Sequence, residues 1–66
     1  MNTYVITLLP HGDKMLPYTI TVHDNTSEAA IIKAKQYVAV NGYWPNFLST
    51  EEIMNLLEVD NIVTST

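Results

Sequence analysis

The stretch that decides the fold is residues 25–41, N-T-S-E-A-A-I-I-K-A-K-Q-Y-V-A-V-N, which predicts the one long helix of a very small domain. Asn25 suits the N-cap, and Glu28, three residues later, can reach back to the cap amide as in a capping box. Gly42, just past the end, suits a left-handed C-terminal cap. At about 100° per residue, one arc of this helix is apolar and is expected to be buried. Its members are Ala30, Ile31, Ala34, Tyr37 and Val38.

The opposite side of the same helix carries little charge for a solvated face. Its residues are Ala29, Ile32, Gln36 and Ala39, with Lys33 and Lys35 on the flanks. Either a second short helix packs there, or Ile32 is simply exposed, as single apolar residues commonly are. The other explanation is a partner or self-association surface centred on Ile32.

Alternating residues predict strands before this helix. Residues 3–9 and 17–23 carry β-branched and aromatic residues at period two, and the connection 10–16 is turn-rich, with Gly12 and Asp13 near its tip. We expect an antiparallel hairpin with one face against the helix. The apolar face would hold Tyr4, Ile6, Leu8, Tyr18, Ile20 and Val22, and the threonine-rich face Thr3, Thr7, Thr19 and Thr21.

After the helix, residues 43–48 form the densest aromatic patch of the chain, and Pro45 disfavours helix at the preceding residue. We expect Phe47 and Leu48 to join the core. Tyr43 and Trp44 remain open between a lid on the core and a binding contact, because aromatic side chains dominate binding hot spots.

A second capping box, with Ser49 as the cap and Glu52 in the third helical position, begins a short helix from about residue 50 to residue 57. Leu48 and Ile53 are spaced for a hydrophobic staple. Residues 59–64 predict a third strand, which most easily pairs beside the first. The expected fold is therefore α+β: an antiparallel hairpin, extended to a three-stranded sheet, packed on one long helix with a short second helix in the order ββααβ.

Length and composition limit the class of protein. Sixty-six residues predict one domain, residues 1–66, and a chain of this size buries only about 60% of its unfolded surface. The absence of cysteine excludes a disulfide framework and a thiolate metal site, and favours a cytoplasmic protein. Residues 1–4 lack the basic start of a signal peptide, and no apolar run approaches the roughly 20 residues that span a bilayer.

The charge balance bears on partners. Seven acidic residues face three lysines and no arginine, which gives a net charge of −4. Because affinity for nucleic acid rests on Lys and Arg that neutralise phosphates, direct binding to DNA or RNA is not expected. The acidic balance either serves solubility alone or favours a partner with a basic surface.

No pattern in the sequence indicates an enzyme, a cofactor or a metal site. His11 and Asp13 fall in the predicted turn, and His23 and Asp24 at the far end of the following strand. Those ends are roughly 20–25 Å apart at about 3.3 Å per residue, so the two histidines cannot share a metal. The sequence also lacks a cysteine nucleophile and a glycine-rich phosphate loop.

A strand that ends in a turn is followed by a helix that begins with Glu28-Ala29 and ends in Gln36-Tyr37-Val38, with Gly42 and Tyr43 shortly after. This scheme, over residues 17–43, resembles the small early proteins by which phages disable host machinery, in particular the RNA-polymerase inhibitor of T-odd coliphages. That inhibitor uses arginine in its polymerase contact and lacks a second helix, so no functional residue is carried across. Small acidic inhibitors of defence nucleases and CRISPR complexes match this chain equally in size, charge and lack of cysteine.

The leading hypothesis is a non-enzymatic inhibitor or adaptor, encoded by a phage or mobile element and cytoplasmic in its bacterial host, that blocks a host protein by occlusion. Asp24 and Glu28 would steer it to a basic surface, and Ile32, Tyr43 and Trp44 would anchor it. The alternative is a structural module that forms a homodimer through its spare apolar faces. No membrane contact is expected.

Overall fold

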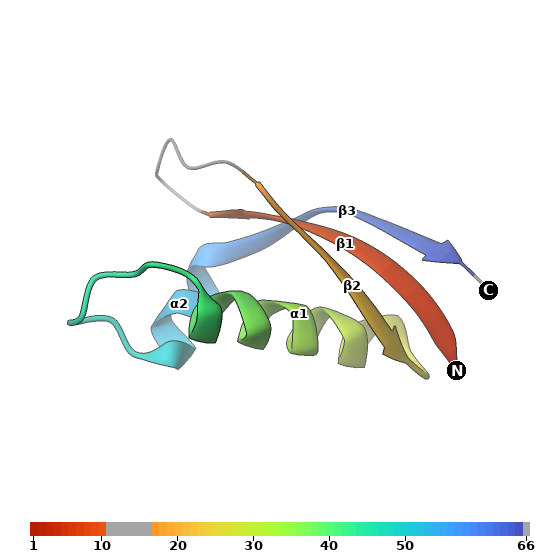
Figure 1. Ribbon diagram of the computed structural model, residues 1–66, viewed down its shortest axis with the longest axis horizontal. Coiled ribbons are helices and arrows are strands. Elements are labelled where there is room, and N and C mark those ends of the chain that lie inside the picture. Colours follow the sequence, from red (N-terminus) through yellow and green to blue (C-terminus); the bar gives the residue numbers. More distant parts are fainter. Residues whose placement is uncertain (11–16, 66) are drawn as a thin grey trace.

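The computed structural model describes residues 1–10 and 17–65 and has the expected α+β architecture in the order ββααβ. Figure 1 shows two layers, with the sheet on one side and both helices on the other, and with the two termini at the same end of the molecule. The predicted turn, with His11 and Asp13, lies outside the described residues. The elements are β1 (Asn2–Pro10), β2 (Tyr18–Asp24), α1 (Ser27–Asn41), α2 (Thr50–Leu56) and β3 (Leu57–Ser65).

The sheet is antiparallel with the strand order β2-β1-β3, so the last strand pairs beside the first, as expected. Ile6 is opposite Ile20 on one side and Ile62 on the other. The pairing of β1 with β2 is regular, whereas the pairing with β3 shifts register between Thr7 and Leu8. β3 is longer than the predicted strand because it begins directly where α2 ends.

Alternation along β1 places one face of the sheet in the core. Tyr4, Ile6 and Leu8 are buried, and Ile6 and Leu8 are fully so. Across the layer, Ala30 and Ala34 have no exposed surface, and their small side chains let the helix axis approach the sheet. The core is completed by Val22, Val38, Ala39, Ile53 and Leu57.

The start of α1 differs from the prediction. Thr26, not Asn25, is the N-cap, and its hydroxyl accepts a hydrogen bond from the amide of Ala29 at 3.2 Å. The backbone amide of Asn25 donates to the carboxylate of Asp24 at 2.7 Å, just before the helix begins. The predicted capping box with Glu28 is therefore wrong, because Glu28 is only two residues beyond the cap.

Two residues of α1 lie on unexpected sides. Tyr37 is 57% exposed, not buried, because it lies on the flank of α1 beside β2, the outer strand of the described sheet. Ala39 is buried on the supposedly outer side, because α2 packs against α1 there. The second helix therefore covers only one edge of that side and leaves Ile32 55% exposed.

The second capping box is confirmed. The hydroxyl of Ser49 accepts from the amide of Glu52 at 3.2 Å, and the carboxylate of Glu52 accepts from the amide of Ser49 at 3.3 Å. α2 ends one residue earlier than predicted, at Leu56, and Leu57 begins β3.

Candidate binding surface

Trp44 fixes the segment between the two helices. Its indole N–H donates a hydrogen bond to the carbonyl of Val38 at 3.0 Å, and the same carbonyl accepts from the amide of Gly42 at 2.9 Å. The ring is half-buried, packs on the core and lies 6.3 Å from the ring of Tyr18, centroid to centroid. Trp44 therefore lies on the core as a lid would, and its indole is a second donor to a carbonyl at the end of α1.

Gly42 is needed for this contact, but not as a left-handed cap. Its φ of −85° and ψ of 170° are extended, so the predicted left-handed conformation is wrong. A Cβ atom at this position would lie 2.6 Å from the indole nitrogen of Trp44 and 2.8 Å from the carbonyl oxygen of Val38. Only glycine leaves room for the indole to reach the helix end.

The aromatic neighbours of Trp44 point outward. Tyr43 is 97% exposed and Phe47 is 82% exposed, so the prediction that Phe47 joins the core is wrong. Trp44 and the half-buried Leu48 pack on the core instead, and a turn closed by the Leu48 amide and the Pro45 carbonyl separates them. We call Tyr43 and Phe47, held by the Trp44 anchor, the aromatic loop.

One line of exposed side chains runs along α1 toward this loop. Its members recur at every fourth position and so lie on one side of the helix; they are Glu28, Ile32, Gln36 and Val40. We call them the outer stripe. The stripe begins with an acidic residue and ends with Val40, which is 69% exposed. Polar and apolar groups therefore share one face over the roughly 20 Å of the helix.

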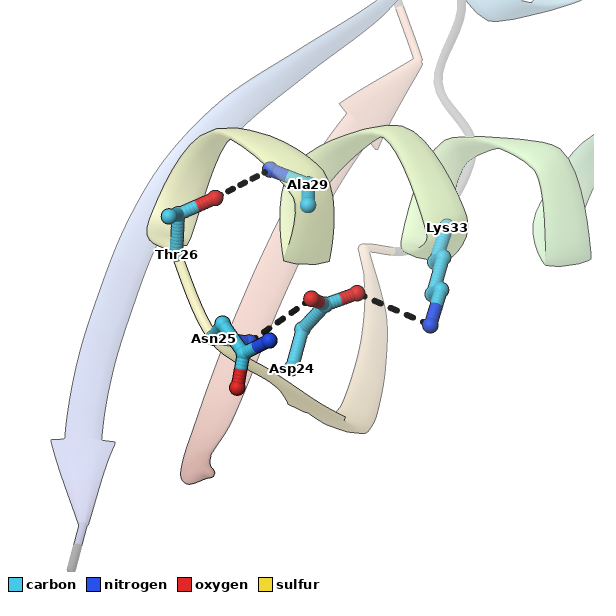
Figure 2. Close-up of polar contacts among 5 residues, drawn as sticks. All are labelled: Asp24, Asn25, Thr26, Ala29 and Lys33. Carbon is cyan, nitrogen blue, oxygen red and sulfur yellow. Dashed lines mark hydrogen bonds and ion pairs between the residues drawn. The ribbon is translucent and has the colours of Figure 1, made fainter.

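Asp24 lies apart from this stripe, in the polar cluster that Figure 2 shows. One carboxylate oxygen is 2.8 Å from the Lys33 ammonium, and the other accepts from the amide of Asn25 at 2.7 Å. The hydrogen bond from Lys33, and then that from Asn25, hold the pKa of Asp24 below its ordinary value. Because Lys33 offsets its charge, Asp24 is less suited to steering than the exposed Glu28.

The five residues expected at the site thus separate. Glu28 and Ile32 belong to the outer stripe, and Tyr43 belongs to the aromatic loop. Trp44 supports that loop from within, and Asp24 is paired with Lys33 at the other end of α1. The structure adds two residues that the sequence analysis missed. Val40 could have been found from the spacing of four, whereas Phe47 carries no such signal.

Shallow depressions of the described surface lie beside α1. One lies between β2 and α1, beside Ile20, Val22 and Tyr37. Another lies between the end of α1 and the start of α2, beside Trp44 and Ile53. Among residues 1–10 and 17–65, no three His, Asp or Glu side chains are grouped as a metal site would require. Neither of the helices described is both long and apolar enough to cross a membrane.

No family model, no curated protein and no solved structure matches this chain.

Proposed function

We propose that this chain is a non-enzymatic protein-binding module that inhibits or recruits a host protein by covering part of its surface. The contact would be made by the aromatic loop, Tyr43 and Phe47, together with the outer stripe of α1. The proposal includes a phage or mobile-element origin and a cytoplasmic setting, in line with the resemblance of residues 17–43 to small phage inhibitors. RNA polymerase and a defence nuclease or CRISPR complex are the candidate partners.

The observation that carries the proposal is the contrast between Trp44 and its neighbours. Two large aromatic side chains stand 97% and 82% exposed on a segment whose backbone is fixed at the end of α1. Burial of such apolar area against a partner would contribute roughly 25 cal/mol of favourable free energy for each Å². Exposed aromatic side chains are typical of binding hot spots, and a backbone that is already held in place loses less conformational entropy when the partner binds.

The outer stripe would extend the contact along α1. Ile32 and Val40 offer apolar area between the polar side chains of Glu28 and Gln36. Glu28 and the protein's net charge of −4 favour approach to a basic surface, which raises the association rate more than the final affinity. Binding would thus act by occlusion and would need no chemical step.

The test is capture from a bacterial lysate with three matched baits: the wild-type chain, the Tyr43→Ala/Phe47→Ala variant and the Val63→Ala variant. Val63 is half exposed on β3, distant in sequence from the loop, and serves as the control for loss of apolar surface. Mass spectrometry should find a protein retained by the wild type and by Val63→Ala but lost at least tenfold with the loop variant. Equal retention by all three baits, or no retained protein at all, would remove the proposal.

A further inference from the structure

The two outer strands of the described sheet are protected to different degrees. An outer strand offers unpaired N–H and C=O groups, and proteins shield such edges with charged residues, bulges or proline. β3 carries Glu58 and Asp60, and its pairing with β1 shifts register. β2 has no charged side chain between Tyr18 and His23, and its pairing is regular. Between Tyr18 and His23, the edge of β2 therefore lacks the charges and the irregular pairing that protect β3.

A depression runs along the edge of β2. It is lined by Ile20, Thr21, Val22 and His23 of β2 and by Lys33 and Tyr37 of α1. Lys33 is paired with Asp24, so the two charged groups at this edge offset each other. In a protein of net charge −4, a second copy would meet little repulsion here, because the one acidic residue of β2, Asp24, is paired with Lys33.

The sequence of β2 is also complementary to a second, antiparallel copy of the same strand. If a second copy of β2 runs antiparallel to the first with Thr21 opposite Thr21, then Ile20 is opposite Val22 on the face toward the helices. On the other face Thr19 is opposite His23. Apolar β-branched residues thus meet each other on one face and polar residues meet on the other, which is the favourable arrangement for cross-strand pairs.

Thr21 is exposed, and its hydroxyl is left to solvent within the described chain. On β1 it is opposite Val5, and its hydroxyl has no hydrogen bond to any residue that the structure describes. The polar residues on either side are already bonded across to β1. His23 bonds to Thr3 at 3.0 Å, and the hydroxyls of Thr19 and Thr7 are 3.4 Å apart. A second Thr21 would offer this hydroxyl a protein partner in place of water.

We propose that two copies of this chain pair through β2, antiparallel about Thr21, to form one continuous sheet with three described strands from each copy. Such an interface is isologous and closes on itself, so it gives a dimer and not a filament. Tyr37, 57% exposed beside the edge, would be covered by the second copy. The inference stands apart from the proposed function, because it rests on β2 and does not involve the aromatic loop.

The first test measures molar mass by light scattering up to millimolar protein. The wild type should approach twice the 7.4 kDa mass of one chain. Thr21→Lys, which places two like charges opposite each other, should shift the mass back to that of one chain. Val63→Lys, on the other outer strand, should leave the dimer unchanged. A wild type that stays at one-chain mass overturns the proposal, and so does a dimer lost in Val63→Lys but kept in Thr21→Lys.

The second test does not depend on how well the lysine variants fold. The chain has no cysteine, so Thr21→Cys introduces a single thiol. Opposite residues of paired strands have Cβ atoms about 4.5–5.5 Å apart, close to disulfide geometry. Mild oxidation should therefore yield a covalent dimer of Thr21→Cys at least tenfold faster than of Val63→Cys. Equal rates, or faster cross-linking of Val63→Cys, would contradict pairing through β2.

The register has its own test. Thr19→Cys alone should cross-link poorly, because the two copies of residue 19 would be about 13 Å apart along the strands. A mixture of Thr19→Cys and His23→Cys should cross-link to the mixed dimer. Efficient cross-linking of Thr19→Cys alone would exclude a dimer centred on Thr21. If β2 instead receives an extended segment of a foreign protein, none of these variants will form a covalent homodimer, which also overturns the proposal.

Discussion

Glycine at position 42 is required for space, since an extended backbone with φ of −85° suits any residue. A methyl group there would meet the Trp44 indole nitrogen at 2.6 Å and the Val38 carbonyl at 2.8 Å. Gly42→Ala should therefore displace the indole and break its hydrogen bond. The expected loss is about 1–3 kcal/mol in the free energy of unfolding, as for other overpacked sites. Urea unfolding measures it, and the fluorescence of this chain's single tryptophan should shift to the red.

The Trp44→Phe variant separates the proposed cause from a general backbone effect. Phenylalanine lacks the indole N–H that donates to the Val38 carbonyl, and its ring is smaller than the indole that lies beside Gly42. If the clash with Trp44 is the cause, the double variant Gly42→Ala/Trp44→Phe should lose less stability than the sum of the two single variants. Additive losses would show that position 42 acts independently of the indole.

Asp24 gives the chain a specific dependence on pH. Its pKa is lowered from the ordinary value of 3.8, first by the hydrogen bond from Lys33 and then by that from Asn25. As the pH falls, the unfolded chain therefore binds this proton before the folded chain does. The stability that Asp24 contributes is present above pH 3.8 and is lost as the pH falls through the folded-state pKa. The stability difference between the wild type and Asp24→Asn should be constant near neutrality and shrink in acid.

Urea unfolding across a pH series measures this difference. In a Lys33→Met background most of the change with pH should be absent, because Lys33 is the larger cause of the lowered pKa. A difference between wild type and Asp24→Asn that is equally large at every pH would show that the ion pair contributes nothing to it.

Among the elements, α2 depends most on its first turn. It has only seven residues, too few for a helix to be stable by itself in water. The reciprocal bonds of Ser49 and Glu52 satisfy two amides at its start, and α2 in turn carries the buried Ile53 and leads directly into β3. Ser49→Ala should cost about 1 kcal/mol of unfolding free energy, measured by thermal or urea unfolding.

The matched control is Thr50→Ala, the exposed neighbour one position along. It should change stability by no more than about 0.5 kcal/mol, as surface substitutions usually do. Ser49→Asp should retain most of the stability, since aspartate also accepts from the amides of a first turn. A loss in Thr50→Ala as large as that in Ser49→Ala would mean that the cap is not what holds α2.

The helices and strands also show which features the sequence patterns predict. Period two along residues 3–9 and 17–23, and the Ser49–Glu52 spacing, predicted strands and a cap that the structure confirms. The start of α1 escaped prediction because Asn25 and Thr26 are both good caps, and the spacing of residues alone does not select Thr26. Tyr37 was predicted to lie in the core because its angle around the helix falls within the apolar arc. It is exposed because β2, beside it, is the outer strand of the described sheet.

The candidate surface was harder to predict than the fold. The sequence left Ile32 and Tyr43 open between ordinary roles and binding anchors, and both are exposed, whereas Trp44, named with them, packs on the core. In residues 43–48, however, there are five large or cyclic side chains, and only Trp44 and Leu48 pack on the core. Composition cannot tell that the indole N–H will select Trp44 by reaching Val38 and so leave Phe47 outside. That choice depends on a hydrogen bond between residues six positions apart in the sequence, Trp44 and Val38, which no periodic pattern predicts.

For the whole molecule, the strand order places β1 between two partners and leaves β2 and β3 each with one described neighbour (Figure 1). Amide hydrogen exchange should therefore be slowest in β1, because its amides are paired or covered on both sides and open only with the sheet. If copies pair through β2, raising the protein concentration should slow exchange in residues 18–24 and leave β3 unchanged. Monitoring exchange at two concentrations by NMR or mass spectrometry gives the result. Protection that rises with concentration in β3, while β2 stays constant, would place the contact between copies on the edge that carries Glu58 and Asp60.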